Sequence, residues 1–262
     1  MAMQIDIWCA FCQSITDPPL LERYRQLLTA AELQQASRFH FAHDRHRYLI
    51  TRALVRTTLS RYADVLPERW TFVPNDYGRP CISNADTGAL GISFNLSHSR
   101  ELVVLAVTRD HELGIDTEDV LTREPPLEIA DRFFAPEEVA TLRALPPERQ
   151  HERFFQHWTL KESYIKARGM GLSIPLDQFA FHFSHPAGVR LTIQPRLQDA
   201  AENWRFWQWW IEPRRQHMLA LCAQHVSADP PRLTLRQIVP LMSEKDLVPE
   251  LIVSSQAAAG AT

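Results

Sequence analysis

Three acidic side chains are spaced so that they could act on one cation: Asp116, Glu118 and Glu162. The first two lie in residues 113–118, whose apolar and polar alternation predicts a strand. Side chains two apart in a strand project from the same face, with Cα atoms about 6.6–7 Å apart. Two carboxylates at that spacing raise each other's pKa unless a cation lies between them. An exposed edge with solvated acids is the alternative, which the buried strand predicted over residues 102–107 disfavours.

Glu162 belongs to the stretch 154–172, which predicts a helix that stops at Gly169. Large apolar side chains fall on one side of this helix, namely Phe154, Phe155, Trp158 and Ile165. Glu162 projects from within that apolar arc, where an uncompensated carboxylate costs several kcal/mol of desolvation. Two interpretations stay open from the helix alone. Either Lys161 or Lys166 neutralises Glu162 as a structural pair, or the site binds a metal or a phosphate.

The chemistry of the three acids favours a particular kind of ion. Oxygen ligands without histidine or thiolate favour Mg²⁺, or Mn²⁺, over zinc. Mg²⁺ fills its remaining coordination positions with waters and substrate phosphates. Lys161 and Lys166, beside Glu162, would meet such phosphates as point charges. These residues therefore predict a Mg²⁺-dependent transfer or cleavage at a phosphate.

Composition narrows the class of protein. The chain has 262 residues and a formal net charge of −3, which argues against a nucleic-acid partner. No apolar run approaches the length of a membrane span, and residues 1–10 do not have the pattern of a signal peptide, so we expect a cytoplasmic protein. The four cysteines are expected to be free thiols, because the C-x-x-C pair at Cys9 and Cys12 has no second pair. A metal site at His40, His43 and His46 is disfavoured because no matching carboxylates accompany it.

The elements that must position the acids can be read from periodicity and turn signals. Strands are expected at 4–12, 70–80, 92–99, 102–107, 113–118, 179–193, 204–211 and 217–224. Helices are expected at 20–38, with a capping box at Thr29 and Glu32, and at 45–62, 129–134, 136–145 and 154–168. Residues 113–118 are expected to form a hairpin with 102–107, and the aromatic cluster at 204–211 predicts a sheet face. Residues beyond 226 are expected to be a loosely attached tail.

Four sequence blocks carry a family resemblance. GIDTE (114–118) followed by WTLKESYIK (158–166) resembles the 4′-phosphopantetheinyl transferase signature G-[IV]-D-x-E … W-x-x-K-E-[SA]-x-x-K, and GMGL (169–172) matches the G-x-G-L that closes it. YGRP (77–80) and FNLSHS (94–99) are similar to the family blocks Y-G-K-P and F-N-[IL]-S-H-S. Their order and spacing resemble the long, Sfp-type branch, and the resemblance covers about residues 35–225.

The resemblance implies an α+β fold of two similar halves related by a pseudo-twofold. Each half is a small antiparallel sheet packed on a long helix. The first half, residues 1–115, would take the adenine and 3′-phosphate side of coenzyme A; the second, residues 116–226, would be catalytic; residues 227–262 would be the tail. Coenzyme A would lie in the cleft between the halves of a monomer.

The resemblance also implies an activity, that of a holo-[acyl-carrier-protein] synthase. Such an enzyme transfers 4′-phosphopantetheine from coenzyme A to a serine of apo acyl or peptidyl carrier protein domains, and releases adenosine 3′,5′-bisphosphate. Asp116, Glu118 and Glu162 would hold Mg²⁺, with Glu162 as general base only second to its role as ligand. Lys166 would be catalytic and bind the phosphates of coenzyme A, and Lys161 would assist it or pack the helix.

The 3′-phosphate side is implied in the same way. His98, Arg79, Arg47 and Ser97 would contact coenzyme A there. Where Sfp-type members often carry lysines for this phosphate, the chain has Glu32 and Gln35, so we expect binding to depend more on Arg47, Arg79 and His98.

Three questions stay open at this point. A Mg²⁺-dependent pyrophosphate hydrolase and a non-catalytic module that binds coenzyme A or a carrier protein are the alternative functions. Residues 120–134, with apolar side chains at Leu127, Ile129, Phe133 and Phe134, are either a carrier-docking surface or an ordinary core helix. The identity of the carrier protein is the third question.

Overall fold

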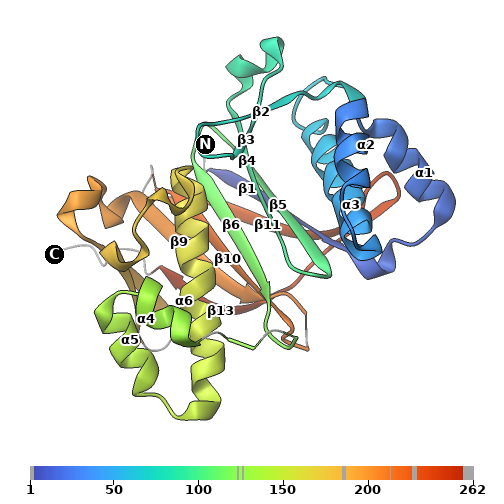
Figure 1. The fold of residues 1–262 in the computed structure, drawn as a ribbon. Helices are drawn as coiled ribbons and strands as arrows, with labels where there is room; N and C mark the ends of the chain where they lie inside the picture. The colour runs from blue at the N-terminus through green and yellow to red at the C-terminus, as the bar shows by residue number, and fades with distance from the viewer. Residues whose placement is uncertain are drawn as a thin grey trace. The chain divides into compact units, whose positions relative to one another are not determined.

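The computed structural model describes residues 3–122, 124–125, 127–184, 187–212, 214–225 and 229–255 (Figure 1). Its contacts divide the chain into two compact units. Unit 1 is Met1–His111 with Pro230–Leu247, and unit 2 is Glu112–Asp229 with Val248–Thr262. Residues 112–115 therefore belong to the second unit and not to the first half.

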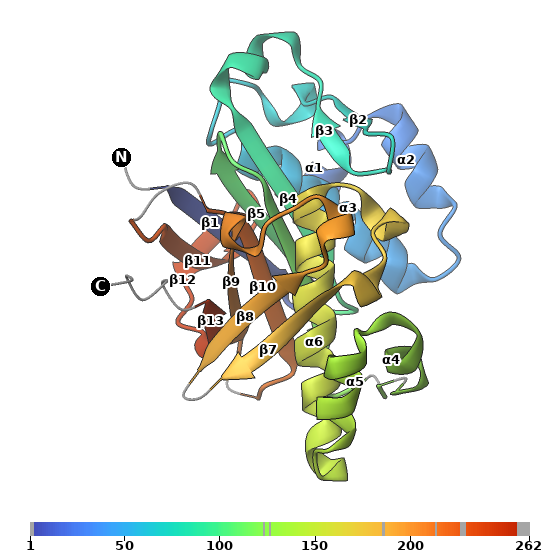
Figure 2. The same ribbon diagram turned by 90° about the vertical axis from the view of Figure 1, so that its left-hand side faces the viewer.

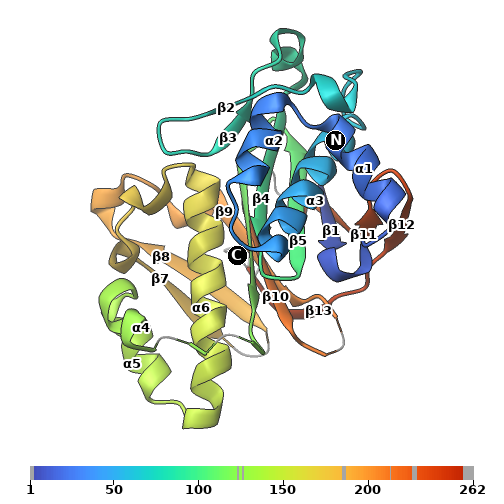
Figure 3. The same ribbon diagram turned by 45° about the vertical axis from the view of Figure 1, so that its right-hand side comes forward.

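Unit 1 packs its longest helix against a sheet, and two further helices pack on that helix. Its helices are α1 (Pro18–Leu27), α2 (Ala30–Ser37) and α3 (Ala42–Leu59). Its strands are β1 (Gln4–Phe11), β4 (Ile92–His98), β5 (Leu102–Arg109), β11 (Arg232–Val239) and β12 (Ser243–Asp246), in the order β12-β11-β1-β5-β4, with a separate pair of β2 (Phe72–Pro74) and β3 (Pro80–Ile82). Helix α3 contacts α1, α2 and β5 (Figure 3). The core between them includes Leu54, Leu59 and Trp70, all fully buried.

Local sequence explains where the unit 1 helices begin. Asp17 caps α1 by accepting a hydrogen bond from Leu20 N, and proline follows at the first helical position. The capping box expected at Thr29 and Glu32 is confirmed at the start of α2. The buried strand expected at residues 102–107 is confirmed as β5, in which all six of those residues are fully buried.

Unit 2 lays one long helix along a sheet. Its helices are α4 (Leu127–Phe133), α5 (Pro136–Arg143) and α6 (Pro147–Arg168). Its strands are β6 (Leu113–Asp119), β7 (Phe179–Ser184), β8 (Gly188–Ile193), β9 (Trp204–Trp210), β10 (His217–Gln224) and β13 (Glu250–Ser255), in the order β6-β10-β9-β13-β8-β7. Helix α6 contacts β6, β10, β9 and β7, and α5 lies against it (Figure 2).

Helix α6 ends where the sequence predicts. Gly169 takes a left-handed conformation, with φ of 65°, and its amide closes the last turn on Ile165 O and Lys166 O. The tryptophan-rich strand is confirmed as part of a sheet, because Trp204, Trp209 and Trp210 are all buried.

The pairing of the strands corrects three expectations. Strand β6 does not form a hairpin with β5; it pairs with β10, and β5 pairs with β4 and β1. The stretch expected to be one strand over residues 179–193 is the hairpin of β7 and β8. The sheets are not purely antiparallel, since β1 pairs with β11 and β13 pairs with β8 in parallel.

The expectation of a loose C-terminal tail is wrong for residues 229–255, and the remainder of the expected tail, residues 227–228 and 256–262, lies outside the described residues. Residues 232–246 contribute β11 and β12 to the unit 1 sheet, and residues 250–255 contribute β13 to the unit 2 sheet. Most residues of β11 are only half-buried, so the hydrophobic pattern of this strand is weak. Pro230 and Pro231, directly before it, favour a loop. The α+β class is confirmed, each unit having a sheet and a long helix, and the pseudo-twofold stays a prediction.

Two compositional expectations can be compared with the structure. All four cysteines are free thiols, as expected. Within the described ranges, no helix combines the length and the apolar character that crossing a membrane requires.

Candidate active site

One face of β6 is directed at helix α6. Gly114, Asp116 and Glu118 share this face because strand side chains alternate. A Cβ atom on Gly114 would lie 2.1 Å from Ser163 O and 2.3 Å from Ala167 N, both backbone atoms of α6. Only glycine fits there, so this residue lets the helix backbone rest directly on the strand.

The two acids of that face each contact a side chain of α6. Lys166 Nζ lies 2.7 Å from Asp116 Oδ1, and Trp158 Nε1 donates to Glu118 Oε1 over 3.1 Å. Glu162 is one turn after Trp158 and one turn before Lys166, so it lies on the same stripe of the helix. The alternation of the strand and the spacing of the helix therefore direct all three acids to the contact between β6 and α6. We call Asp116, Glu118 and Glu162 the acidic triad.

Charges within the acidic triad act on one another. Asp116 is 5% exposed, and Glu118 and Glu162 are half-buried. Burial, first, and then the negative charge of Asp116 raise the pKa of Glu162 to about 7; Lys166 opposes them, and Glu118 adds the smallest contribution. Of the two lysines, Lys161 pairs with Glu138, and Lys166 pairs with Asp116 and offsets only part of the raised pKa of Glu162.

The donor set fits a divalent cation in its chemistry. It offers only carboxylate oxygens, which Mg²⁺ and Mn²⁺ prefer, and its mutual repulsion would be relieved by positive charge. As they stand, however, the described side chains include no group of three histidine, cysteine, aspartate or glutamate residues placed to hold a metal ion. His40, His43 and His46, which are among the described residues, form no such group; His43 Nε2 lies 3.5 Å from Asp44 Oδ1, and His46 Nε2 lies 3.0 Å from Cys12 O.

Lys161 is a correction to the expected set of phosphate-binding and catalytic residues. Its side chain is 1% exposed, and its Nζ lies 2.7 Å from Glu138 Oε2. The same ammonium donates to Leu176 O and Phe179 O over 2.8 and 2.7 Å. Adjacent residues of a helix point about 100° apart, which is why a lysine next to Glu162 faces the protein interior.

The residues expected at the 3′-phosphate lie in unit 1. Arg79 donates to Phe94 O of β4 over 3.3 Å, and Ser97 and His98 follow on the same strand, Ser97 buried and His98 exposed. Arg79 therefore contacts the same strand as the other two residues, while Ser97 and His98 project from opposite faces of it. Arg47 lies on α3, where its guanidinium pairs with Asp44 at 2.6 Å. The role of the four in binding a phosphate stays a prediction.

Glu32, which stands where a family lysine is common, has a structural role. Besides capping α2, it accepts from Arg52 Nε and Arg56 Nη2, both over 2.7 Å. Burial acts to raise the pKa of Glu32, but the Thr29 amide and the two arginines outweigh it and lower that pKa. A carboxylate held this way belongs to the packing of α2 on α3.

Two residues near the site, Asp119 and Glu138, were not predicted from the sequence. Asp119 faces away from the triad: its Oδ1 accepts from Leu121 N and Thr122 N, and its Oδ2 from Gln216. Glu138, buried beneath α6, is the partner of Lys161. The position of Glu138 three residues after Ala135 could have indicated that it accepts from the first amide of the helix. No sequence pattern indicates that Glu138 pairs with Lys161.

Comparison with known proteins defines the class to which this fold and site belong. A model of the 4′-phosphopantetheinyl transferase superfamily matches residues 112–222. A model described as the N-terminal part of 4′-phosphopantetheinyl transferases matches residues 18–110. The two matches correspond closely to units 2 and 1, and they describe a two-part transferase.

Individual relatives support the same assignment. A putative 4′-phosphopantetheinyl transferase of Synechocystis sp. is 33% identical over 218 residues, which cover 79% of this chain and 86% of that protein. The 4′-phosphopantetheinyl transferase Sfp of Bacillus subtilis is 32% identical over 204 residues, 78% of this chain and 85% of Sfp. HetI of Nostoc sp., also a 4′-phosphopantetheinyl transferase, is 38% identical over 148 residues, 56% of this chain and 61% of HetI. The chain belongs to the 4′-phosphopantetheinyl transferase superfamily, in its long, Sfp-type branch.

Proposed function

We propose that this protein transfers the 4′-phosphopantetheine group of coenzyme A to a serine of an acyl or peptidyl carrier protein. The products would be a holo carrier protein and adenosine 3′,5′-bisphosphate. The observation that carries the proposal is the stripe on α6, in which Trp158, Glu162 and Lys166 face Glu118 and Asp116 of β6. Membership of the superfamily supports the same reaction.

The acidic triad would hold Mg²⁺, with Mn²⁺ as a possible substitute. The ion, when bound, would neutralise the diphosphate of coenzyme A and the charge that develops during transfer. Lys166 supplies a second positive charge at the same place, because its ammonium lies against Asp116. An ammonium there suits the oxygens of a diphosphate, and so Lys166 is our candidate for binding and stabilising them.

Glu162 serves the proposed reaction as metal ligand first and as general base second. A carboxylate beside the reacting phosphorus could accept the proton of the carrier serine directly or through a water. Replacing Glu162 with Gln should lower turnover by about 10²–10³, the scale of losing one preorganised electrostatic contact. Near-normal transfer by that variant, with Mg²⁺ affinity intact, would remove Glu162 from both roles.

Binding of the 3′-phosphate would depend on Arg47, Arg79, Ser97 and His98 of unit 1. Arg79 donates to Phe94 O of β4, and His98 is four residues further along that strand, where its exposed side chain can reach a ligand. Charge-neutral variants of Arg79 should raise KM for coenzyme A and change KM for dephospho-coenzyme A less. Equal effects on both substrates would place Arg79 elsewhere.

Carrier docking is assigned to the segment around α4. Leu121 and Leu127 are 64% and 38% exposed there, and Leu127 borders a hollow of about 240 Å³ between α4 and α5. Phe134 is buried in the core with Phe154, so the segment is partly a core element; Arg123 and Pro126 lie outside the described residues. Leu127→Glu should raise KM for the carrier and leave KM for coenzyme A unchanged; the reverse pattern would contradict docking here.

Mass spectrometry provides the test of the proposed function. Apo carrier proteins from peptide synthetases, polyketide synthases and fatty-acid synthases are incubated with the protein, coenzyme A and Mg²⁺. We expect at least one carrier to gain the phosphopantetheine mass, and EDTA to prevent the gain. Release of adenosine 3′,5′-bisphosphate without a carrier would indicate a pyrophosphate hydrolase instead. Size-exclusion chromatography of the same sample should show a monomer.

A further inference from the structure

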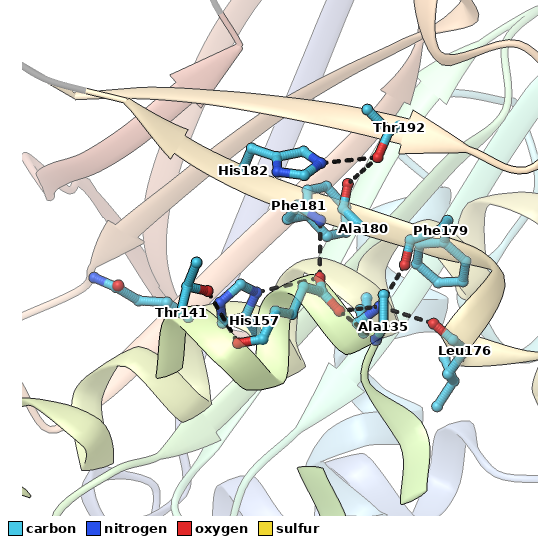
Figure 4. A network of polar contacts seen from close by, with 12 residues as sticks. Ala135, Thr141, His157, Leu176, Phe179, Ala180, Phe181, His182 and Thr192 are labelled. Carbon is cyan, nitrogen blue, oxygen red and sulfur yellow. Dashed lines mark hydrogen bonds and ion pairs between the residues drawn. The ribbon is translucent and has the colours of Figure 1, made fainter. Parts of the chain in front are cut away.

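A buried carboxylate joins three elements beneath the active-site helix (Figure 4). Glu138 Oε2 lies 2.7 Å from Lys161 Nζ and accepts from Ala135 N over 2.9 Å at the start of α5. Glu138 Oε1 accepts from Phe181 N of β7 over 2.8 Å and lies 3.2 Å from His157 Nδ1. The carboxylate therefore contacts α5, α6 and β7 at once.

Glu138 contacts α6 at two successive turns. His157 and Lys161 are four residues apart, so they lie on one stripe of the helix, and both meet Glu138. The three hydrogens of the Lys161 ammonium are taken by Glu138, Leu176 O and Phe179 O. Rotation of α6 about its axis would break these contacts together.

Such a cluster is a poor means of adding stability. Removing charges from water costs several kcal/mol per ion, and well-packed apolar residues often replace a buried ion pair without loss of stability. What the pair supplies is direction, because the contacts of Lys161 Nζ and His157 Nδ1 with Glu138, and of Lys161 Nζ with Leu176 O and Phe179 O, form together at one rotation of α6. That rotation points Glu162, the next residue, toward Asp116 and Glu118.

We propose that Glu138, through Lys161, is a positioning residue for the phosphopantetheinyl transfer: it fixes the rotation of α6 that presents Glu162 to the strand β6 carboxylates. The inference rests on the proposed function. It assigns the lysine of the W-x-x-K-E block to the interior of unit 2 and not to a substrate phosphate. Glu138 itself touches no reacting group.

The test uses Glu138→Asp, which keeps the charge and shortens the side chain. Mn²⁺ binding is measured by electron paramagnetic resonance, and kcat and KM are measured for transfer to a carrier protein. We expect the Mn²⁺ dissociation constant to rise and kcat to fall, each about 10-fold, the scale of losing an outer-shell support, with KM for the carrier unchanged.

Glu32→Asp is the matched control, since Glu32 likewise accepts from the amide of a helix N-cap residue and pairs with a buried cation, Arg56, but in unit 1. It should lose comparable stability while Mn²⁺ affinity and kcat at saturating coenzyme A stay unchanged. If Glu138→Asp does not fold, the neutral pair Glu138→Gln with Lys161→Met is measured in the same way.

A folded Glu138 variant with unchanged Mn²⁺ affinity and kcat would overturn the positioning role. Failure of the proposed function is a separate result: the unaltered protein would then modify no carrier, or would do so equally well without a divalent ion.

Discussion

The indole Nε1 of Trp158 donates a hydrogen bond to Glu118 Oε1 over 3.1 Å, and so joins helix α6 to strand β6 at one end of the acidic triad. Trp158 is half-buried and stacked on Phe154, with ring centroids 6.1 Å apart, so the donor has little freedom to turn away. Hydrogen bonds of this kind orient carboxylates that bind metals. The tryptophan therefore fixes the orientation of the Glu118 carboxylate, which we propose as a ligand of the ion.

Trp158→Phe should weaken binding of Mg²⁺. The ring and its stacking are kept while the hydrogen bond to Glu118 is lost, so the Mg²⁺ concentration for half-maximal transfer should rise about 10-fold. Turnover at saturating Mg²⁺ should change much less. Trp207→Phe, on strand β9, is the control for the loss of an indole. An unchanged Mg²⁺ dependence in Trp158→Phe would show that the hydrogen bond has no part in orienting Glu118.

Gly114→Ala should lower both stability and activity. Its Cβ would meet backbone atoms of α6 at 2.1 and 2.3 Å, and neither the strand nor the helix can move a backbone cheaply. The expected loss is about 1–3 kcal/mol of unfolding free energy, the range for overpacking, together with a fall in Mg²⁺ affinity as the helix shifts away from β6. Chemical denaturation measures the first and calorimetry the second.

Gly88→Ala is the control for that substitution, because nothing lies within 4 Å of the Cβ it would add. It should leave both quantities unchanged. Gly114→Ala with normal stability would mean that α6 lies farther from β6 than the structure shows.

The raised pKa of Glu162 predicts how the stability of the metal-free protein depends on pH. Between the ordinary value of 4.5 and about 7, folded Glu162 keeps a proton that the unfolded chain has released. Stability therefore falls as pH rises through this window. Compared with Glu162→Gln, the unaltered protein in EDTA should lose about 2–3 kcal/mol of unfolding free energy between pH 4.5 and 7.5.

Excess Mg²⁺ should reverse that loss, because the ion binds the ionised carboxylate. Denaturant titrations at several pH values, with Mg²⁺ or EDTA, measure the effect. If the two proteins gave parallel pH profiles in EDTA, burial and the neighbouring acids would not be acting on Glu162 as described.

Glu32→Lys should destabilise unit 1, although a lysine is common at this place in the family. The new ammonium would face Arg52 and Arg56, which now pair with Glu32, and it would remove the cap of α2. Breaking a buried pair of this kind costs about 3–5 kcal/mol. Gln35→Lys, on the exposed side of α2, should cost little in the same denaturation experiment. A stable Glu32→Lys variant would contradict the structural role.

Local sequence patterns predicted much of the secondary structure and the placement of the acids at the centre of the site. The alternation in β6 put Asp116 and Glu118 on one face, and helical spacing put Glu162 between Trp158 and Lys166. Both are short-range properties, set by backbone geometry alone. The capping box of α2 and the glycine that ends α6 are of the same kind.

Long-range pairing could not be predicted in this way. Whether β6 pairs with β5 or with β10 depends on contacts between residues far apart in the sequence. The same is true of the parallel pairing of β11 with β1. Lys161 shows the same limit within one helix: its neighbour Glu162 faces the site, but Glu138 determines where the lysine points. Gly114 was visible in the motif, yet its contact with α6 required the fold.

The central claim is that Asp116, Glu118 and Glu162 bind one divalent cation for transfer from coenzyme A. The most direct measurement is an anomalous difference map from crystals grown with Mn²⁺ and coenzyme A. We predict a single Mn²⁺ peak within bonding distance of all three carboxylates and of the diphosphate. A Mn²⁺ peak bound elsewhere, with the three side chains directed apart, would contradict the claim.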